Sequence, residues 1–179
     1  MYYEYLSTKN MDALHAIFTR RSIRKFTPDI INDDDLNIIL KAGMYAPSAV
    51  NKQPWHFIVF RNTDTIKRII EVHPNASPML GANVCILVCY DEELQHDNGY
   101  GAVDCSAATQ NMLLAAHAIG LGAVWLGIYP RQPRMEAISE IFRLPGHVKG
   151  FSIVALGYPD EKKPEPNRFN SGKVHDEQW

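Results

Sequence analysis

The chain of 179 residues has the usual length of one domain with a single substantial core, so we expect one domain over residues 1–179. Hydrophobic residues make up 46% of the chain and charged residues 21%, which is typical of a globular protein and excludes general disorder. The net charge of -2 and a pI near 6.4 leave no basic excess, so we expect neither a nucleic-acid partner nor an anionic membrane partner.

Three cysteines, Cys85, Cys89 and Cys105, are scattered along the chain. Their odd number and apolar surroundings favour reduced packing residues over a disulfide framework. The first ten residues lack the charged and then apolar pattern of a signal peptide, and no stretch reaches the roughly 18 apolar residues of a membrane span. We therefore expect a cytoplasmic protein with no membrane segment.

In the first half of the chain, helical spacing of apolar residues alternates with short polar breaks. Leu14, Ile17 and Phe18 share one face of the first predicted helix, and an acidic first turn precedes the second. In chain order, we expect a helix over 12–21, a helix from 32–34 to before Pro47, a loop over 48–53, a strand over 55–61, a helix over 64–72 and a break over 73–77.

In the second half, a continuous apolar run predicts a strand buried on both faces, and a long segment rich in Ala, Leu and Met predicts a helix buried nearly all round. The expected order is a strand over 83–90, a polar connection over 91–101, a helix over 104–119, strands near 123–126 and 151–156, and a helix near 134–142 between them. Strands interleaved with helices predict an α+β or α/β sandwich with a buried central helix. The proline-rich tail over 160–179 ends in Trp179, so we expect it to pack against something.

Arg20-Arg21-Ser22-Ile23-Arg24 places three guanidinium groups and a hydroxyl within five residues, just past a predicted helix. Such donors bind a phosphate or an electron-rich ring edge well. The alternative is a solvated basic helix end that complements the helix dipole. This segment alone leaves both interpretations open.

The loop from Pro47 to Trp55 offers a hydroxyl and two side-chain amides between two prolines. These donors and acceptors could recognise the edge of a heteroaromatic ring. An ordinary polar turn followed by a core tryptophan is an equal alternative in isolation.

Four segments in this order closely resemble the FMN-binding nitroreductase family, and the resemblance covers nearly the whole chain. They are the Arg20–Arg24 segment, the Pro47–Trp55 loop, the Asp104–Asn111 helix and the stretch from Gly120-Leu121-Gly122 to Trp125-Leu126-Gly127. The resemblance implies an intertwined homodimer with an α+β sandwich fold, in which helices flank a central mixed, mainly antiparallel sheet. It also implies two FMN sites at the interface, each lined by both subunits, with the tail packing nearby.

By this resemblance, Arg20, Ser22 and Arg24 contact the FMN phosphate, ribityl chain and pyrimidine edge, and a backbone N–H of Gly127 or Ile128 meets flavin N5. An arginine at that edge would stabilise the negative charge of reduced flavin, and Arg24 is the candidate. The full set of implied cofactor-binding residues is Arg20, Arg21, Ser22, Arg24, Pro47, Ser48, Asn51, Gln53, Leu126, Gly127, Ile128, Lys163 and Arg168. No catalytic side chain is needed, and no spacing is typical of metal ligands.

The implied function is the transfer of two electrons from NADH or NADPH, through bound FMN, to a small electron-poor acceptor such as a nitroaromatic or a quinone, with ping-pong kinetics. Tyr100-Gly101-Ala102 stands where many relatives carry a bulky aromatic, so the roof over the flavin is expected to be more open. The alternatives are a specialised flavoenzyme of the same superfamily, such as a dehydrogenase or a reductive dehalogenase, and a non-catalytic FMN-binding module.

Overall fold

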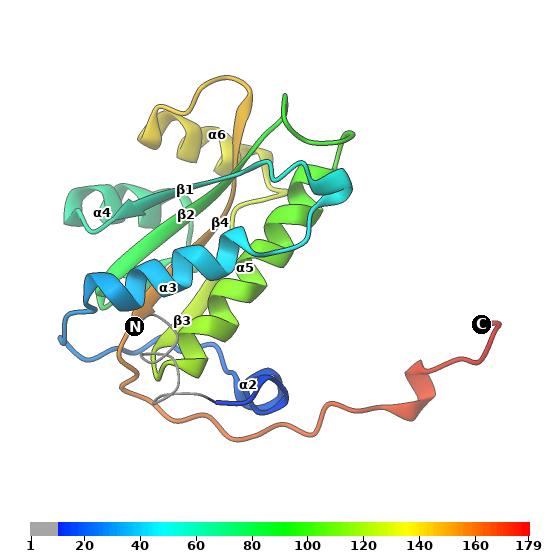
Figure 1. The fold of residues 1–179 in the computed structure, drawn as a ribbon. Helices are drawn as coiled ribbons and strands as arrows, with labels where there is room; N and C mark the ends of the chain where they lie inside the picture. The colour runs from blue at the N-terminus through cyan, green and yellow to red at the C-terminus, as the bar shows by residue number, and fades with distance from the viewer. Residues whose placement is uncertain (1–10) are drawn as a thin grey trace.

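A four-stranded sheet forms the centre of the molecule in a computed structural model that describes residues 11–179 (Figure 1). Its strands are β1 (Trp55–Phe60), β2 (Val84–Asp91), β3 (Gly122–Gly127) and β4 (Val148–Gly157), in the order β1-β2-β4-β3. Neighbouring strands pair antiparallel, and an isolated parallel bridge joins Ser22 to Ala123. β2 and β4 are central and therefore almost entirely buried, as the apolar run in β2 predicts.

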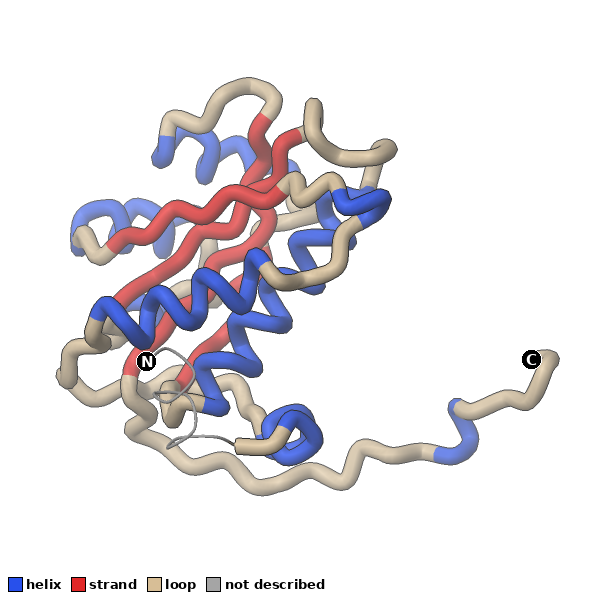
Figure 2. Tube along the Cα trace, viewed as in Figure 1, coloured by secondary structure: helices blue, strands red, loops and turns tan. Residues whose placement is uncertain are grey.

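One face of the sheet is covered by α3 (Asp33–Met44) and α5 (Tyr100–Ala118) (Figure 2). Cys105, Ala108, Met112 and Ala116 of α5 are completely buried, which confirms the predicted central helix. This helix starts four residues earlier than expected, at Tyr100. Gly99 adopts a positive φ just before it, and the side-chain oxygen of Gln95 accepts the otherwise free N–H of Gly101 at 3.0 Å.

The other face is covered by α4 (Thr63–Val72) and α6 (Gln132–Phe142), which pack on a second apolar cluster. The segment between α4 and β2 contains a short 3-10 turn, η2 (Ser77–Leu80). The three cysteines are free and buried, and burial raises the pKa of the Cys85 and Cys89 thiols to about 12. They are packing residues, as predicted.

Helix α2 (Ala13–Thr19) lies across the C-terminal end of α5, and its predicted apolar face points to solvent. Leu14 and Phe18 are 62% and 67% exposed, whereas Ala16 on the opposite side is buried. The tail beyond β4 runs past α2 and then extends away from the body, with a short 3-10 turn, η3 (Ser171–Lys173), near its end (Figure 1). The last part of the tail is therefore exposed and packs against no other described part of the chain.

The α+β architecture and each helix and strand predicted between residues 12 and 157 are present, with shifted ends. Among the described residues, none of the helices combines the length and the apolar character that a membrane crossing requires.

Candidate functional site

The arginine segment, Arg20–Arg24, runs along the outer edge of β3. Ile23 donates its backbone N–H to the Ala123 carbonyl at 2.9 Å, beside the parallel bridge from Ser22. Gly122 permits this close approach, because a Cβ there would lie 2.8 Å from the Ile23 side chain. The edge of the sheet therefore holds the predicted phosphate-binding residues in place.

Four arginines here have no carboxylate partner among the residues that the structure describes. Partial burial, followed by the positive charges of Arg168 and Arg21, lowers the pKa of the Arg20 guanidinium. Across residues 11–179 no ion pair joins Arg20, Arg21, Arg24 or Arg168 to an acidic side chain. Like charges held together in this way repel one another, and a bound anion would relieve that repulsion.

Arg21 and Lys163 already make contacts within the chain, which the resemblance does not imply. Arg21 donates through Nε to the Pro164 carbonyl at 2.9 Å and through Nη1 to the Phe18 and Arg20 carbonyls, which ties the tail to the end of α2. Its buried Nη2 has no hydrogen-bond partner among the described residues. Lys163 pairs with Glu161 at 2.6 Å, so part of its charge is already neutralised.

The outer edge of β3 also presents a free backbone donor. Ile128 donates its N–H to the Phe151 carbonyl at 3.1 Å, so it is committed to β4. In an antiparallel pair, successive residues alternate between hydrogen bonding to the neighbouring strand and pointing away from it. Gly127, which is paired with Ser152, therefore points its N–H and carbonyl away from β4. Of the two residues considered from the sequence, only Gly127 has its N–H directed outward.

A hollow of about 430 Å³ lies between Arg24, the edge of β3 and the segment His73–Pro78. Its β3 wall includes Trp125 and Leu126. The sequence predicts residues 73–77 only as a break after the preceding helix, and it does not reveal them as a wall of the site. The Pro74-Asn75 turn was the available signal, but nothing in its spacing links it to Arg24.

Arg134 of α6 joins the two walls of this hollow. Its Nη1 donates to the Gly127 carbonyl at 2.6 Å and lies 3.3 Å from Nε2 of His73. Both side chains are buried, and burial, followed by the charge of Arg134, lowers the pKa of His73. His73 is therefore neutral with Nε2 as acceptor. Sequence reasoning also missed this pair, because its members are 61 residues apart.

The Ser48 loop, Pro47–Gln53, is held in an unusual backbone conformation. Val50, Asn51 and Gln53 all have positive φ, which is costly for residues other than glycine. The Ser48 hydroxyl accepts the N–H of Gln53 at 3.0 Å, and the Gln53 amide donates to the Asn51 side chain at 2.9 Å. Strain of this kind, on an exposed polar loop, is typical of a ligand-binding segment.

The Ser48 loop and the arginine segment lie at opposite ends of α5. Ala49 donates its N–H to Asp104 in the second turn of α5, whereas Thr19, next to Arg20, hydrogen-bonds His117 near its C-terminus. Thirteen residues of helix separate Asp104 from His117, which is roughly 20 Å. The expected convergence of both segments on one flavin therefore does not occur within a single chain.

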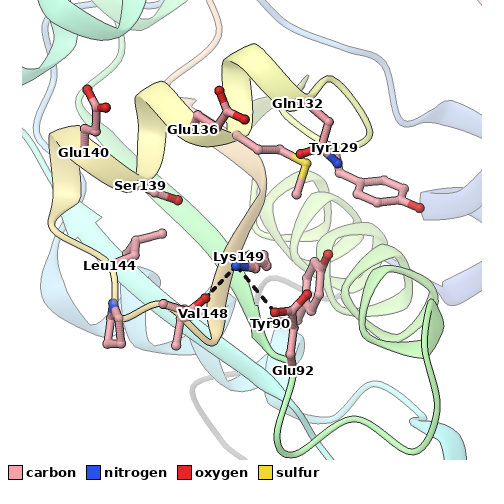
Figure 3. A pocket seen from close by; sticks show the side chains of 13 residues that line it. Tyr90, Glu92, Tyr129, Gln132, Glu136, Ser139, Glu140, Leu144, Val148 and Lys149 are labelled. Carbon is pink, nitrogen blue, oxygen red and sulfur yellow. Dashed lines mark hydrogen bonds and ion pairs between the residues drawn. The ribbon is translucent and has the colours of Figure 1, made fainter.

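A second hollow of about 440 Å³ lies between α6 and the ends of β2 and β4 (Figure 3). Glu92, Glu136 and Glu140 line it together with one lysine, Lys149, which pairs with Glu92 at 3.4 Å. None of the implied cofactor-binding residues reaches it. Its acidic lining is unsuited to a phosphorylated ligand.

Comparison with known proteins agrees with this geometry. The model of the nitroreductase family matches residues 17–74 and 72–158, which is most of the chain. The chain belongs to the nitroreductase family. A protein of Methanothermobacter thermautotrophicus, provisionally named NADH dehydrogenase/NAD(P)H nitroreductase, is 47% identical over 94% of this chain and 88% of its own length.

Two crystal structures of the family show the same fold. One, of a provisionally named NADH dehydrogenase/NAD(P)H nitroreductase from Parabacteroides distasonis, has a TM-score of 0.88 at 34% identity and covers 93% of this chain and 98% of its own. The other is a nitroreductase, also provisionally named, from Desulfovibrio desulfuricans in complex with FMN. It has a TM-score of 0.81 at 31% identity and covers 95% of this chain and 99% of its own.

Proposed function

We propose that this nitroreductase-family protein is an NAD(P)H-dependent oxidoreductase that binds FMN non-covalently. The observation that carries the proposal is the arginine segment with Arg168, cations that have no carboxylate partner within residues 11–179, on the edge of the strand that ends in the outward N–H of Gly127. The unpaired Nη2 of Arg21 and the space between Arg24 and β3 fit the phosphate and the ring system of this cofactor. Its dianionic phosphate would offset the repulsion within the cluster.

When bound, FMN supplies a ring nitrogen, N5, that accepts a hydride from a nicotinamide and passes it on. The Gly127 N–H would donate to N5 and fix the position of the reacting atom. The Arg24 guanidinium would lie at the pyrimidine edge and stabilise negative charge there. Arg20, Ser22 and Arg168 would hold the phosphorylated tail, with Lys163 shared between the phosphate and Glu161.

We further propose that the protein is a homodimer in which the Ser48 loop of a second copy completes each site. Pro47, Ser48, Asn51 and Gln53 lie too far along α5 to reach a ligand at the arginine segment of their own chain. The exposed apolar face of α2 and the extended tail, with Phe169 and Trp179 largely exposed to solvent, support such a partner. Two copies of the chain would bury these surfaces together.

The proposed reaction is a two-electron reduction of a small electron-poor acceptor, such as a nitroaromatic or a quinone. The proposed reaction needs no side-chain nucleophile, so the chain's part is to bind, orient and exclude water. One open face that receives nicotinamide and acceptor in turn predicts ping-pong kinetics.

Purified protein, reconstituted with FMN and mixed with NADH or NADPH in the absence of oxygen, tests this function. The visible absorbance of the bound flavin should bleach, and a quinone or a nitroaromatic should restore it. A flavin that stays bound and oxidised for minutes with both nicotinamides would identify a binding module instead. Failure to retain FMN at all would contradict the whole proposal.

A further inference from the structure

A group of potential metal ligands lies where β2 ends and where β1 and β4 begin, and none of its members is a proposed flavin-binding residue. Asp91 is the last residue of β2, Glu93 follows it by two residues, and His147 directly precedes β4. One ligand atom from each lies within 4.8 Å of the other two. His56 of β1 adds a second imidazole, with Nε2 4.0 Å from Asp91 Oδ2.

The backbone holds this Asp91 cluster in place. Asp91 donates its N–H to the Pro54 carbonyl at 2.8 Å, and Glu92 donates to the His147 carbonyl at 2.8 Å, so the three strand ends are fixed to one another. The Asp91 Oδ1 atom accepts the N–H of Glu93 at 2.8 Å. This turn leaves Oδ2 directed at the two imidazoles, and the Asp91 side chain is only 12% exposed.

The distances from the two imidazoles to Asp91 are slightly longer than those between ligands that share an ion. His147 Nε2 lies 3.7 Å and His56 Nε2 4.0 Å from Asp91 Oδ2, and both separations are too long for a hydrogen bond. Two ligands bound tetrahedrally at about 2.1 Å from one metal ion are about 3.4 Å apart. Small movements of the partly exposed imidazoles would therefore complete a coordination shell.

The neighbouring acidic residue does not belong to the cluster. Glu92 lies between Asp91 and Glu93 in sequence, but its carboxylate pairs with Lys149 in the second hollow (Figure 3). The turn that follows β2 therefore separates one carboxylate from the two that meet His147. A merely acidic surface would favour Mg²⁺ or Ca²⁺, whereas imidazole nitrogens favour borderline ions.

We propose that Asp91, Glu93, His147 and His56 form a Zn²⁺-binding site that clamps the ends of β1, β2 and β4. Asp91, Glu93 and His147 would supply three ligands, and the exposed His56, with Nε2 4.0 Å from Asp91 Oδ2, would move toward them to complete a tetrahedral set of two oxygens and two nitrogens. Because Asp91 also holds Pro54, directly after the Ser48 loop, bound Zn²⁺ would stabilise the start of β1. The site shares no residue with the arginine segment or the Ser48 loop, so its occupancy by Zn²⁺ can be measured separately from the binding of FMN.

Isothermal titration of the tag-free, FMN-reconstituted protein with ZnCl2 tests the site. One Zn²⁺ should bind per chain, and Co²⁺ in its place should give the visible absorption of a tetrahedral ion. His147→Gln and Glu93→Gln, both at exposed or half-exposed positions, should each weaken binding roughly tenfold or more, since even groups that only support a ligand are worth that much. The double variant His56→Gln/His147→Gln should lose the site.

His96→Gln is the matched control, because His96 also faces a carboxylate, that of Asp97, at 3.7 Å but without a third ligand. It should bind Zn²⁺ like the unmodified protein. The proposal is overturned if the unmodified protein binds no Zn²⁺, if the double variant binds it equally well, or if excess MgCl2 displaces it. Far-ultraviolet circular dichroism of each variant excludes unfolding as the cause of lost binding.

Discussion

At the residue scale, Arg20 carries a positive charge in surroundings that disfavour it. Desolvation and the nearby Arg168 and Arg21 all disfavour its charged form, yet a guanidinium does not lose its proton in a protein near neutral pH. The free protein therefore carries the electrostatic cost of this cluster. Such a cost is typical of a binding site prepared for an anion.

Arg20→Ala should have opposite effects on the free protein and on the complex. FMN should bind roughly ten- to hundredfold more weakly, which corresponds to one charge-assisted contact. The unfolding temperature of the FMN-free protein should stay the same or rise, because a like charge is removed. Fluorescence titration and thermal unfolding check the two effects. Lys67→Ala, on the far helix α4, should change neither, and equal FMN affinity in both variants would rule out the assignment of Arg20.

His73 predicts a pH dependence of stability. Its pKa is lower in the folded protein than in the unfolded chain, so the unfolded chain takes up the proton first as the pH falls. The contribution of neutral His73 is complete above the unfolded pKa of about 6.5 and is lost progressively at lower pH. Urea unfolding at pH 7.5 and 5.5 should show a smaller decrease for His73→Gln than for the unmodified protein. Identical decreases would mean that His73 does not titrate in this way.

At the scale of elements, the edge position of β3 makes Gly127 available. In a central strand both sides of the backbone are occupied, whereas β3 has a partner only in β4. The arginine segment occupies the first part of the free edge and leaves the end at Gly127 open. One strand thus positions both the cationic segment and the proposed N5 donor.

Gly127→Pro tests the contribution of this N–H without disturbing the pairing of β3 with β4. Proline removes the N–H, which makes no bond to β4, and edge strands tolerate it. We expect the anaerobic reduction of bound FMN by NADPH or NADH to slow at least roughly tenfold, as for the loss of one preorganised donor. Gly127→Ala is the control, because a Cβ there has no atom closer than 4.0 Å and the N–H is kept. Stopped-flow absorbance compares the two, and equal rates would exclude the N–H of Gly127.

At the scale of the whole molecule, the proposed homodimer would account both for the distance between the Ser48 loop and the arginine segment and for the exposed apolar surfaces. In such a dimer the second copy would cover α2. The two chains would have to be intertwined, so that the Ser48 loop of each copy reaches the arginine segment of the other. The tail, which extends away from the body in Figure 1, is long enough to pack along the surface of such a partner.

Phe18→Asp tests the assembly. The side chain is 67% exposed in one chain, so the fold of the single chain should survive, while the buried charge should weaken the dimer by several kcal/mol. Sedimentation velocity over a dilution series should show monomers at concentrations where the unmodified protein is dimeric, together with loss of bound FMN. Lys67→Asp places a carboxylate on the opposite layer and should leave the dimer intact. A flavin-loaded monomer would contradict the shared site.

The sequence by itself determined the order of the elements, because helical and strand periodicities and caps such as Asn32 are local properties. It also determined the family, through short segments whose arginine, hydroxyl, amide and glycine residues occur in a characteristic order. Only the tertiary structure decided what depends on distant residues. It placed Arg134 between His73 and Gly127, freed the Gly127 N–H rather than that of Ile128, and separated the Ser48 loop from Arg20 along α5. These relations follow from strand pairing and helix packing, which bring together residues whose spacing in the chain carries no signal.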